Sequence, residues 1–171
     1  MASTDREQYY FELDTIVEDA KEKIIQEGKY PPKAFVEGKI GSIETELPEI
    51  PEAYEDKLAY MAALGQLMAE SGSIGELLQV FVVSGGSLWK TEKAIHLEFS
   101  ETTCTEAKPV LIVSGVQLEE RKKNLIIFEV LKGSEKQVVG FLDLLLETDI
   151  GIPLETPLED GFIAGFHGAV T

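Results

Sequence analysis

The spacing of apolar residues changes near residue 76, and this change limits the fold more than any other feature of the sequence. In residues 5–27 and 52–71 the apolar residues recur every three or four positions, which is typical of helices with one buried face. From residue 77 onward the apolar runs are short and continuous, or alternate with polar residues, which is typical of strands. The sequence therefore predicts an α+β domain with two N-terminal helices packed on a mainly antiparallel sheet of about five to six strands.

Glycines mark the ends of the two predicted helices. The first helix is predicted over Asp5–Glu27, because Gly28 is a natural stop and two prolines follow it. The second begins near Glu52 and ends before Gly72. Gly65 lies inside this second helix, where it costs about 1 kcal/mol relative to alanine. A close contact with another element would explain a glycine there.

The second half of the chain carries most of the predicted strands. We expect strands over residues 34–40, 77–83, 95–99, 109–116, 125–131 and 137–146. Residues 44–51 are acidic and contain two prolines, so they are predicted to be an extended connector. The charged residues 119–124 are predicted to form a hairpin loop, and Gly140 indicates a bulge in the last strand.

The C-terminal residues differ in composition from the rest of the chain. We expect residues 1–149 to form a single domain, and residues 150–171 to form an apolar and acidic tail without lysine or arginine. The tail is too apolar to be a solvated linker, so it is predicted to pack on its own domain or on a partner subunit. Its large apolar side chains Phe162, Ile163 and Phe166 are the candidate interface residues.

The chain is strongly acidic. It contains 31 acidic and 15 basic residues, which gives a formal net charge of −16 at pH 7. Such a surface repels phosphate backbones and anionic headgroups, so we expect neither nucleic-acid nor membrane-surface binding. The same charge suits a basic protein partner. The solitary cysteine, Cys104, and the lack of a secretory signal favour a reduced, cytoplasmic location.

One short pattern occurs twice in the predicted sheet. Residues 80–88 and 110–118 share five of nine positions, including a Val-Ser-Gly triplet in each. If strands 80–83, 95–99 and 110–113 formed a meander, Ser84 and Ser114 would lie at the same end of the sheet, on the order of 10 Å apart. The hypothesis is a ligand-binding rim at that end. Its candidate residues are Ser84, Gly85, Ser87, Trp89, Lys90, His96, Ser114 and Gly115.

The sequence contains no pattern that indicates an activated nucleophile. There is no Gly-x-Ser-x-Gly elbow around either serine, and His96 and His167 are the only histidines available as bases. Cys104 lies in a polar segment with no indicated cation or helix N-terminus to lower the pKa of its thiol. We therefore assign no catalytic residues, and the sequence favours a protein that is not an enzyme.

The sequence also indicates no bound metal or cofactor. Asp14, Glu18 and Glu22 share one helix face, but a solvated acidic stripe explains them better than a cation site. No dinucleotide-binding, phosphate-binding or paired-histidine zinc motif occurs. We predict no cofactor and no metal.

Three functional hypotheses remain open at this point. The favoured one is a non-catalytic cytosolic protein that acts by self-association, with a dimer as the first guess, or by binding a partner protein. The second is a small-molecule-binding or enzymatic domain that uses the rim around Ser84 and Ser114. The third is an acidic mimic of nucleic acid that occupies a basic protein.

Overall fold

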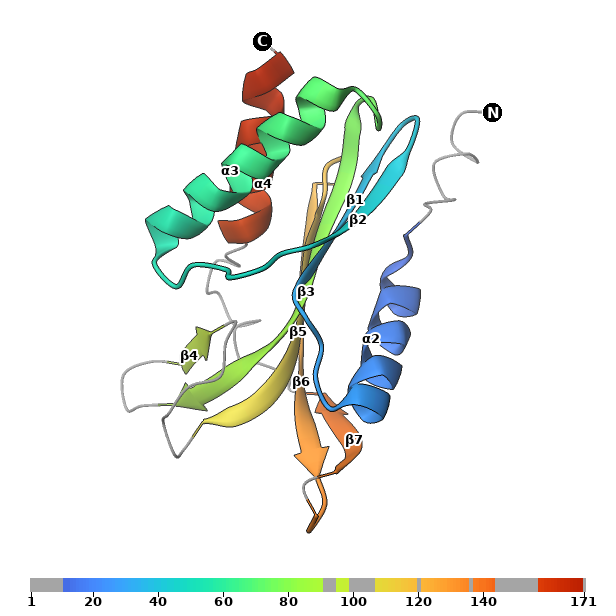
Figure 1. Cartoon of the computed structure of the whole chain (residues 1–171), viewed down its shortest axis with the longest axis vertical. Coiled ribbons are helices and arrows are strands. Elements are labelled where there is room, and N and C mark those ends of the chain that lie inside the picture. The colour runs from blue at the N-terminus through green and yellow to red at the C-terminus, as the bar shows by residue number, and fades with distance from the viewer. Residues whose placement is uncertain are drawn as a thin grey trace.

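The computed structural model describes residues 11–90, 95–98, 107–119, 121–135, 137–143 and 157–170, which form an α+β fold (Figure 1). The α+β class predicted from the sequence is therefore confirmed. The described elements, in chain order, are α2 (Leu13–Glu27), β1 (Lys33–Gly38), β2 (Ser42–Glu46), α3 (Tyr54–Ser71), β3 (Leu77–Lys90), β4 (Ile95–Glu98), β5 (Lys108–Gln117), β6 (Lys122–Lys132), β7 (Val138–Asp143) and α4 (Pro157–Val170).

The strands form one antiparallel sheet in the order β2-β1-β3-β5-β6-β7, and β4 also pairs with β3. Along one edge of β3, β1 pairs with it up to Val83 and β4 pairs with it from Ser87. Along the other edge, β5 pairs with β3 from Gln79 to Leu88 without a break. Residues 84–86 therefore have a described strand partner on one edge only.

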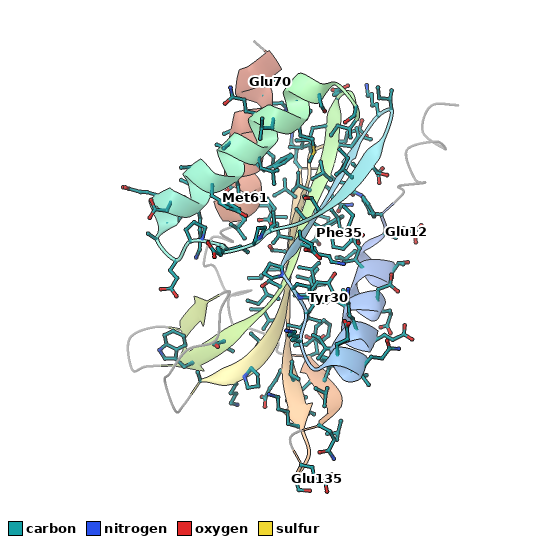
Figure 2. The ribbon with its side chains drawn as sticks, viewed as in Figure 1. Glu12, Tyr30, Phe35, Met61, Glu70 and Glu135 are labelled. Atoms are coloured by element: carbon teal, nitrogen blue, oxygen red, sulfur yellow. The ribbon has the colours of Figure 1, made fainter. Side chains whose placement is uncertain are left out.

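The helices cover both faces of the sheet (Figure 1). On one face α2 buries Ile16, Val17, Ala20 and Ile24 against the strands, and we call this the α2 face. On the other face α3 and α4 pack on the sheet and on each other, and we call this the α3/α4 face. Figure 2 shows Phe35 of β1 on the side of α2, and Met61 on the side of α3 that faces the sheet.

The predicted helix ends are confirmed, whereas one helix start differs. α2 ends at Glu27 and α3 at Ser71, and the glycine after each has a positive φ, 81° at Gly28 and 66° at Gly72. This left-handed conformation suits glycine, which lacks a Cβ. α2 begins at Leu13 and not at Asp5 as predicted, since Phe11 and Glu12 precede it and are not helical. Residues 5–10 of the predicted helix lie outside the described residues.

The prediction of two N-terminal helices was incomplete, because the described part of the tail forms a third helix, α4. Its glycines lower helix propensity, yet they allow close packing. A Cβ on Gly161 would lie 2.7 Å from the carbonyl oxygen of Leu58 in α3, so the two backbones are nearly in contact. Gly65 of α3 faces α4 in the same way, and a Cβ there would collide with the carbonyl group of Phe162. This contact explains the glycine inside the predicted second helix.

Several strand boundaries also required correction. β2 occupies part of the predicted connector, because residues 42–46 pair with β1 as a hairpin before the prolines begin. The β5–β6 turn is shorter than predicted: β6 already starts at Lys122, and Arg121 has a positive φ of 52°. The predicted meander is wrong, because β5 pairs directly with β3.

Candidate functional site

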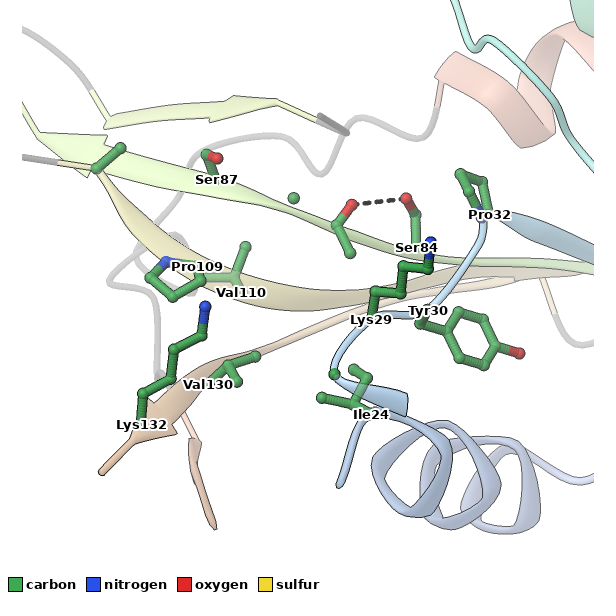
Figure 3. Close-up of a pocket in the computed structure, with 14 residues that line it drawn as sticks. Ile24, Lys29, Tyr30, Pro32, Ser84, Ser87, Pro109, Val110, Val130 and Lys132 are labelled. Atoms are coloured by element: carbon green, nitrogen blue, oxygen red, sulfur yellow. Dashed lines mark hydrogen bonds between the residues drawn. The ribbon is translucent and has the colours of Figure 1, made fainter. Parts of the chain in front are cut away.

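A cavity of about 450 Å³ lies beside the stretch of β3 that has a strand partner on one edge only (Figure 3). It is lined from the α2 side by the end of α2 and the connector that follows, and from the sheet by the middle of β3 and the neighbouring ends of β5 and β6. Its volume lies within the range of pockets that hold small molecules.

The sequence of the connector and of β3 creates this space. Gly28 turns the chain out of α2, and Pro31 and Pro32 keep it extended until β1 begins. On the opposite wall, Gly85 and Gly86 contribute no side chains. A Cβ on Gly85 would have the carbonyl oxygens of Tyr30 and Val110 as its nearest neighbours, at 3.7 and 4.0 Å, which are ordinary contacts. The cavity therefore occupies space that a larger side chain at this position would take.

The walls combine apolar and polar groups in similar measure, and the rim carries positive charge. Side chains of Ile24 and Val130, which both belong to the core of the α2 face, contribute apolar surface. Lys29 and Lys132 contribute two ammonium groups, and the described lining includes no acidic residue. In the view of Figure 3 the two lysine side chains lie on different sides of the lining. In a chain with 31 acidic and 15 basic residues, such a lining is unusual.

The two lysines differ in their partners from several other lysines of the described chain, such as Lys39 and Lys108. Lys39 pairs with Glu76 at 2.5 Å, and Lys108 pairs with Glu129 at 3.4 Å. Neither Lys29 nor Lys132 forms an ion pair within the described part of the chain. Both side chains are exposed, so their charges are available at the cavity.

Three residues with hydroxyl groups also belong to the lining. The side chain of Ser84 shares the sheet face of Val82 and Ile112, opposite to the α2 face. Ser84 donates a hydrogen bond to the carbonyl oxygen of Gly85 at 2.6 Å. Ser87 is buried and also lines the cavity. Tyr30 lines it as well; burial, and to a smaller extent Glu44, raises the pKa of its hydroxyl to about 12. Tyr30 is therefore neutral at physiological pH.

Ser84 and Ser114, which the repeated triplet suggested as a pair, do not form a common rim. They lie on adjacent antiparallel strands, where Ser84 is opposite Ile112 and Ser114 is opposite Val82. Both serines are buried, at 0% and 4% exposure, and Ser114 does not contribute to the described lining. The expected placement at one sheet end was wrong because β3 continues well past Ser84 instead of ending there.

Ser114 instead contacts a buried acid of α4 that the sequence analysis missed. Its hydroxyl donates a short hydrogen bond to Oε1 of Glu159, and no group in the described residues donates to Oε2. Burial raises the pKa of the Glu159 carboxyl to about 7, although the hydrogen bond from Ser114 lowers it. No signal in the sequence distinguishes Glu159 from the many exposed acids, since the α4 helix itself was not predicted.

The other predicted site residues lie apart from the cavity or outside the described side chains. Trp89 is opposite His96 in the β3–β4 pair, and it is not part of the described lining. The side chains of Lys90 and His96 are outside the described part of the structure, as is Cys104. Gly115 serves packing, because a Cβ there would collide with the ring of Phe81. Gly85 and Ser87, in contrast, both line the cavity.

The predicted interface residues of the tail are mostly inside the chain's own core. Phe162 and Phe166 are buried, at 0% and 4% exposure, in the cluster that α4 forms with α3 and the sheet. Ile163 packs against the same cluster and is only partly buried. The two phenylalanines therefore have a structural role within the chain, in place of the predicted contact with another subunit.

The fold and the cavity define an α+β protein with an open antiparallel sheet and a ligand-sized space under one helix. No family model, curated protein or solved structure matches the chain. Within the described residues, no helix is long and apolar enough to cross a membrane. In the same residues, no group of three or more His, Cys, Asp or Glu side chains is arranged to hold a metal ion.

Proposed function

We propose that the protein is a binding protein and that the cavity beside residues 84–87 takes up a small molecule. The observation that carries this proposal is a space of about 450 Å³ whose lining combines apolar side chains with lysine, tyrosine and serine residues, because small-molecule sites have this size and combine apolar surface with polar groups that orient the ligand. The proposal keeps the ligand-binding roles of Ser84, Gly85 and Ser87, which contribute to the lining. It leaves out Ser114 and Gly115, which pack elsewhere in the core.

A variant that fills the cavity tests this proposal. In Gly85→Leu the new side chain has room at its Cβ, and it extends into the space that a ligand would occupy. We expect fragment molecules that bind the unmodified protein, detected by ligand-observed NMR, to lose at least about tenfold in affinity in this variant. Gly140→Leu on β7 is the matched control, because nothing lies within 4 Å of a Cβ there. A fragment library without any hit, or hits that bind Gly85→Leu unchanged, would contradict the proposal.

Self-association is a second candidate function, and the edge strand β7 supports it. No described strand pairs with the outer edge of β7, and two of its apolar side chains, Val139 and Leu142, are 62% and 51% exposed. An exposed apolar edge strand is a favourable place for pairing with a second copy of a chain. We therefore retain a homo-oligomer, with a dimer first, as a prediction.

Light scattering on two double variants tests this second candidate. Val139→Glu with Leu142→Glu should shift any dimer to monomer, because charge on an edge strand opposes strand pairing. Ile40→Glu with Leu67→Glu is the control, since these side chains are 73% and 65% exposed on other elements. A molecular mass of one chain for the unmodified protein at micromolar concentration would rule out the dimer. The predictions of a basic partner protein and of a cytoplasmic location rest on composition alone and stay predictions.

A further inference from the structure

The charge around the cavity differs in sign from the charge of the whole chain. The described lining contains two lysines and no acid, whereas the chain carries a formal net charge of −16. If the charged residues of this chain were distributed at random, acidic residues would occur at the rim of the cavity more often than basic ones. Lysines that stay without an acidic partner in an acidic protein retain their capacity to bind an anion.

The lysines also have a suitable arrangement for one ligand. Lys29 belongs to the connector after α2 and Lys132 to the end of β6, so they reach the cavity from two different elements. In the view of Figure 3, Val130, which belongs to the core of the α2 face, lies between them. A molecule that enters this space would meet ammonium groups at the rim and, beside polar groups, the apolar side chains of Ile24 and Val130.

We infer that the ligand is a small organic anion, in which an oxyanion group such as a carboxylate or a phosphate binds Lys29 and Lys132 and an apolar body fills the cavity. This inference rests on the proposed function, because it specifies the chemistry of a molecule that the cavity must first accept. The apolar walls supply burial for the body of the ligand. The lysines supply the preference for negative charge, because an ammonium group attracts an oxyanion and forms charge-assisted hydrogen bonds with it.

The expected effect of each lysine is modest. Both side chains are exposed, and ion pairs in contact with water are weak because water screens them. We therefore expect Lys29→Gln and Lys132→Gln each to weaken binding of an anionic ligand by about two- to fivefold. The double variant should lose about tenfold. Lys122→Gln is the matched control, because this exposed lysine lies at the opposite end of β6 and has no ion pair within the described residues.

The test compares small acids with their neutral isosteres. The probes are benzoate, 3-phenylpropionate and hexanoate, each with its primary amide, together with inorganic phosphate; binding is measured by NMR titration at low and at moderate salt. We expect the carboxylates to bind at least about fivefold more tightly than the amides, and the difference to shrink in the double lysine variant and at higher salt. Phosphate alone should compete with benzoate only weakly, since it lacks the apolar body.

The possible outcomes separate this inference from the proposed function. Amides that bind as tightly as their acids would overturn the anion preference and leave small-molecule binding intact. Acids that bind tightly but equally well to the double lysine variant would also overturn it, since another group would then select the charge. A fragment library without any hit would contradict the binding site itself, and therefore both the proposed function and the anion preference.

A charge-reversal variant provides a second test of the two lysines. In Lys29→Glu with Lys132→Glu, the rim becomes acidic while the apolar walls stay unchanged. We expect this variant to lose benzoate binding and to gain affinity for 2-phenylethylamine, whose ammonium group replaces the carboxylate. A variant that binds neither molecule but keeps the affinity for benzamide would overturn the assignment of the lysines as the charge-selecting groups.

Discussion

On the α2 face a single helix of 15 residues covers the sheet and leaves a cavity at its end, whereas on the α3/α4 face two helices pack on the sheet and on each other. The difference is visible at the glycines of the two faces. A Cβ on Gly65 or Gly165 would collide with the backbone of the neighbouring helix, whereas a Cβ on Gly85 has only ordinary contacts. At Gly65 and Gly165, α3 and α4 leave no room between their backbones, whereas the cavity lies on the α2 face.

The two faces also treat buried carboxyl groups differently. On the α2 face, Oε1 of Glu37 accepts hydrogen bonds from the backbone N–H of Phe11 at 2.9 Å and from Gln79 at 3.3 Å. On the α3/α4 face, Glu159 accepts a side-chain hydrogen bond from Ser114, and its Oε2 has no hydrogen-bond partner in the described residues. A buried carboxylate with too few donors is costly to ionise. The stability of the α3/α4 face therefore depends on pH, through the ionisation of Glu159.

The largest effect is expected from a leucine between the two helices. Gly65→Leu should destabilise the protein by about 3 kcal/mol or more, because its Cβ meets the carbonyl group of Phe162 and α4 must move away. Urea unfolding measures this change in the free energy of unfolding. Without that contact, replacing a glycine inside a helix would be favourable by up to about 1 kcal/mol.

A second glycine in the same pair of helices provides the control. Gly168 of α4 has nothing within 4 Å of a Cβ, so Gly168→Leu should be neutral or slightly stabilising. If Gly65→Leu behaved like Gly168→Leu, the close contact between α3 and α4 would be refuted. The comparison between the faces would then lose its main support.

The second effect concerns the pH dependence of stability. Glu159 has a pKa of about 7 in the folded protein against 4.5 for an unperturbed carboxyl. Below about pH 4.5 the group is protonated in both states, so its contribution to stability is fully present there. As the pH rises to about 7, the unfolded state ionises more readily than the folded state, and roughly 3 kcal/mol of stability is lost.

Glu159→Gln tests this loss, because the amide stays neutral at every pH and can still accept the hydrogen bond from Ser114. We expect the variant to be more stable than the unmodified protein at pH 8, by up to about 3 kcal/mol, and to lose this advantage at pH 4.5. The measurement is urea unfolding at a series of pH values. Glu70→Gln, on an exposed position of α3, controls for the change in net charge. A constant difference between variant and unmodified protein from pH 4.5 to 8 would contradict the raised pKa.

The sequence predicted local structure better than it predicted which elements meet. The period change near residue 76 gave the α+β class, and the glycines at positions 28 and 72 gave both helix ends, because these signals act within a few residues. The strands that pair with β3 could not be predicted from such local signals. β3 pairs with both β4 and β5, one along each edge, and this arrangement depends on contacts far apart along the chain, so the expected meander was wrong.

The site was predictable only in part, for a related physical reason. Gly85 was singled out because it belongs to a repeated Val-Ser-Gly triplet, and Ser87 because it follows closely after it; the cavity does lie beside both residues. Lys29 and Lys132 were missed, because nothing local distinguishes them from other lysines until the fold brings the connector and β6 together. The α4 helix was missed because its three glycines resemble a loop, and only the contact with α3 explains them.

The smallest effect is expected on the open face. Gly85→Leu should change the free energy of unfolding by no more than about 1 kcal/mol, because its Cβ has room and a strand loses stability when it contains glycine. Its thermal midpoint should therefore shift by no more than about 4 °C. Gly140→Leu, on the edge strand β7, is the control. It measures the gain in the free energy of unfolding that comes from replacing a strand glycine alone, because nothing lies within 4 Å of the new Cβ. A loss of several kcal/mol in Gly85→Leu, but not in Gly140→Leu, would mean that the space beside β3 is already filled. Both faces of the sheet would then be equally tightly packed, and the cavity could not hold a ligand.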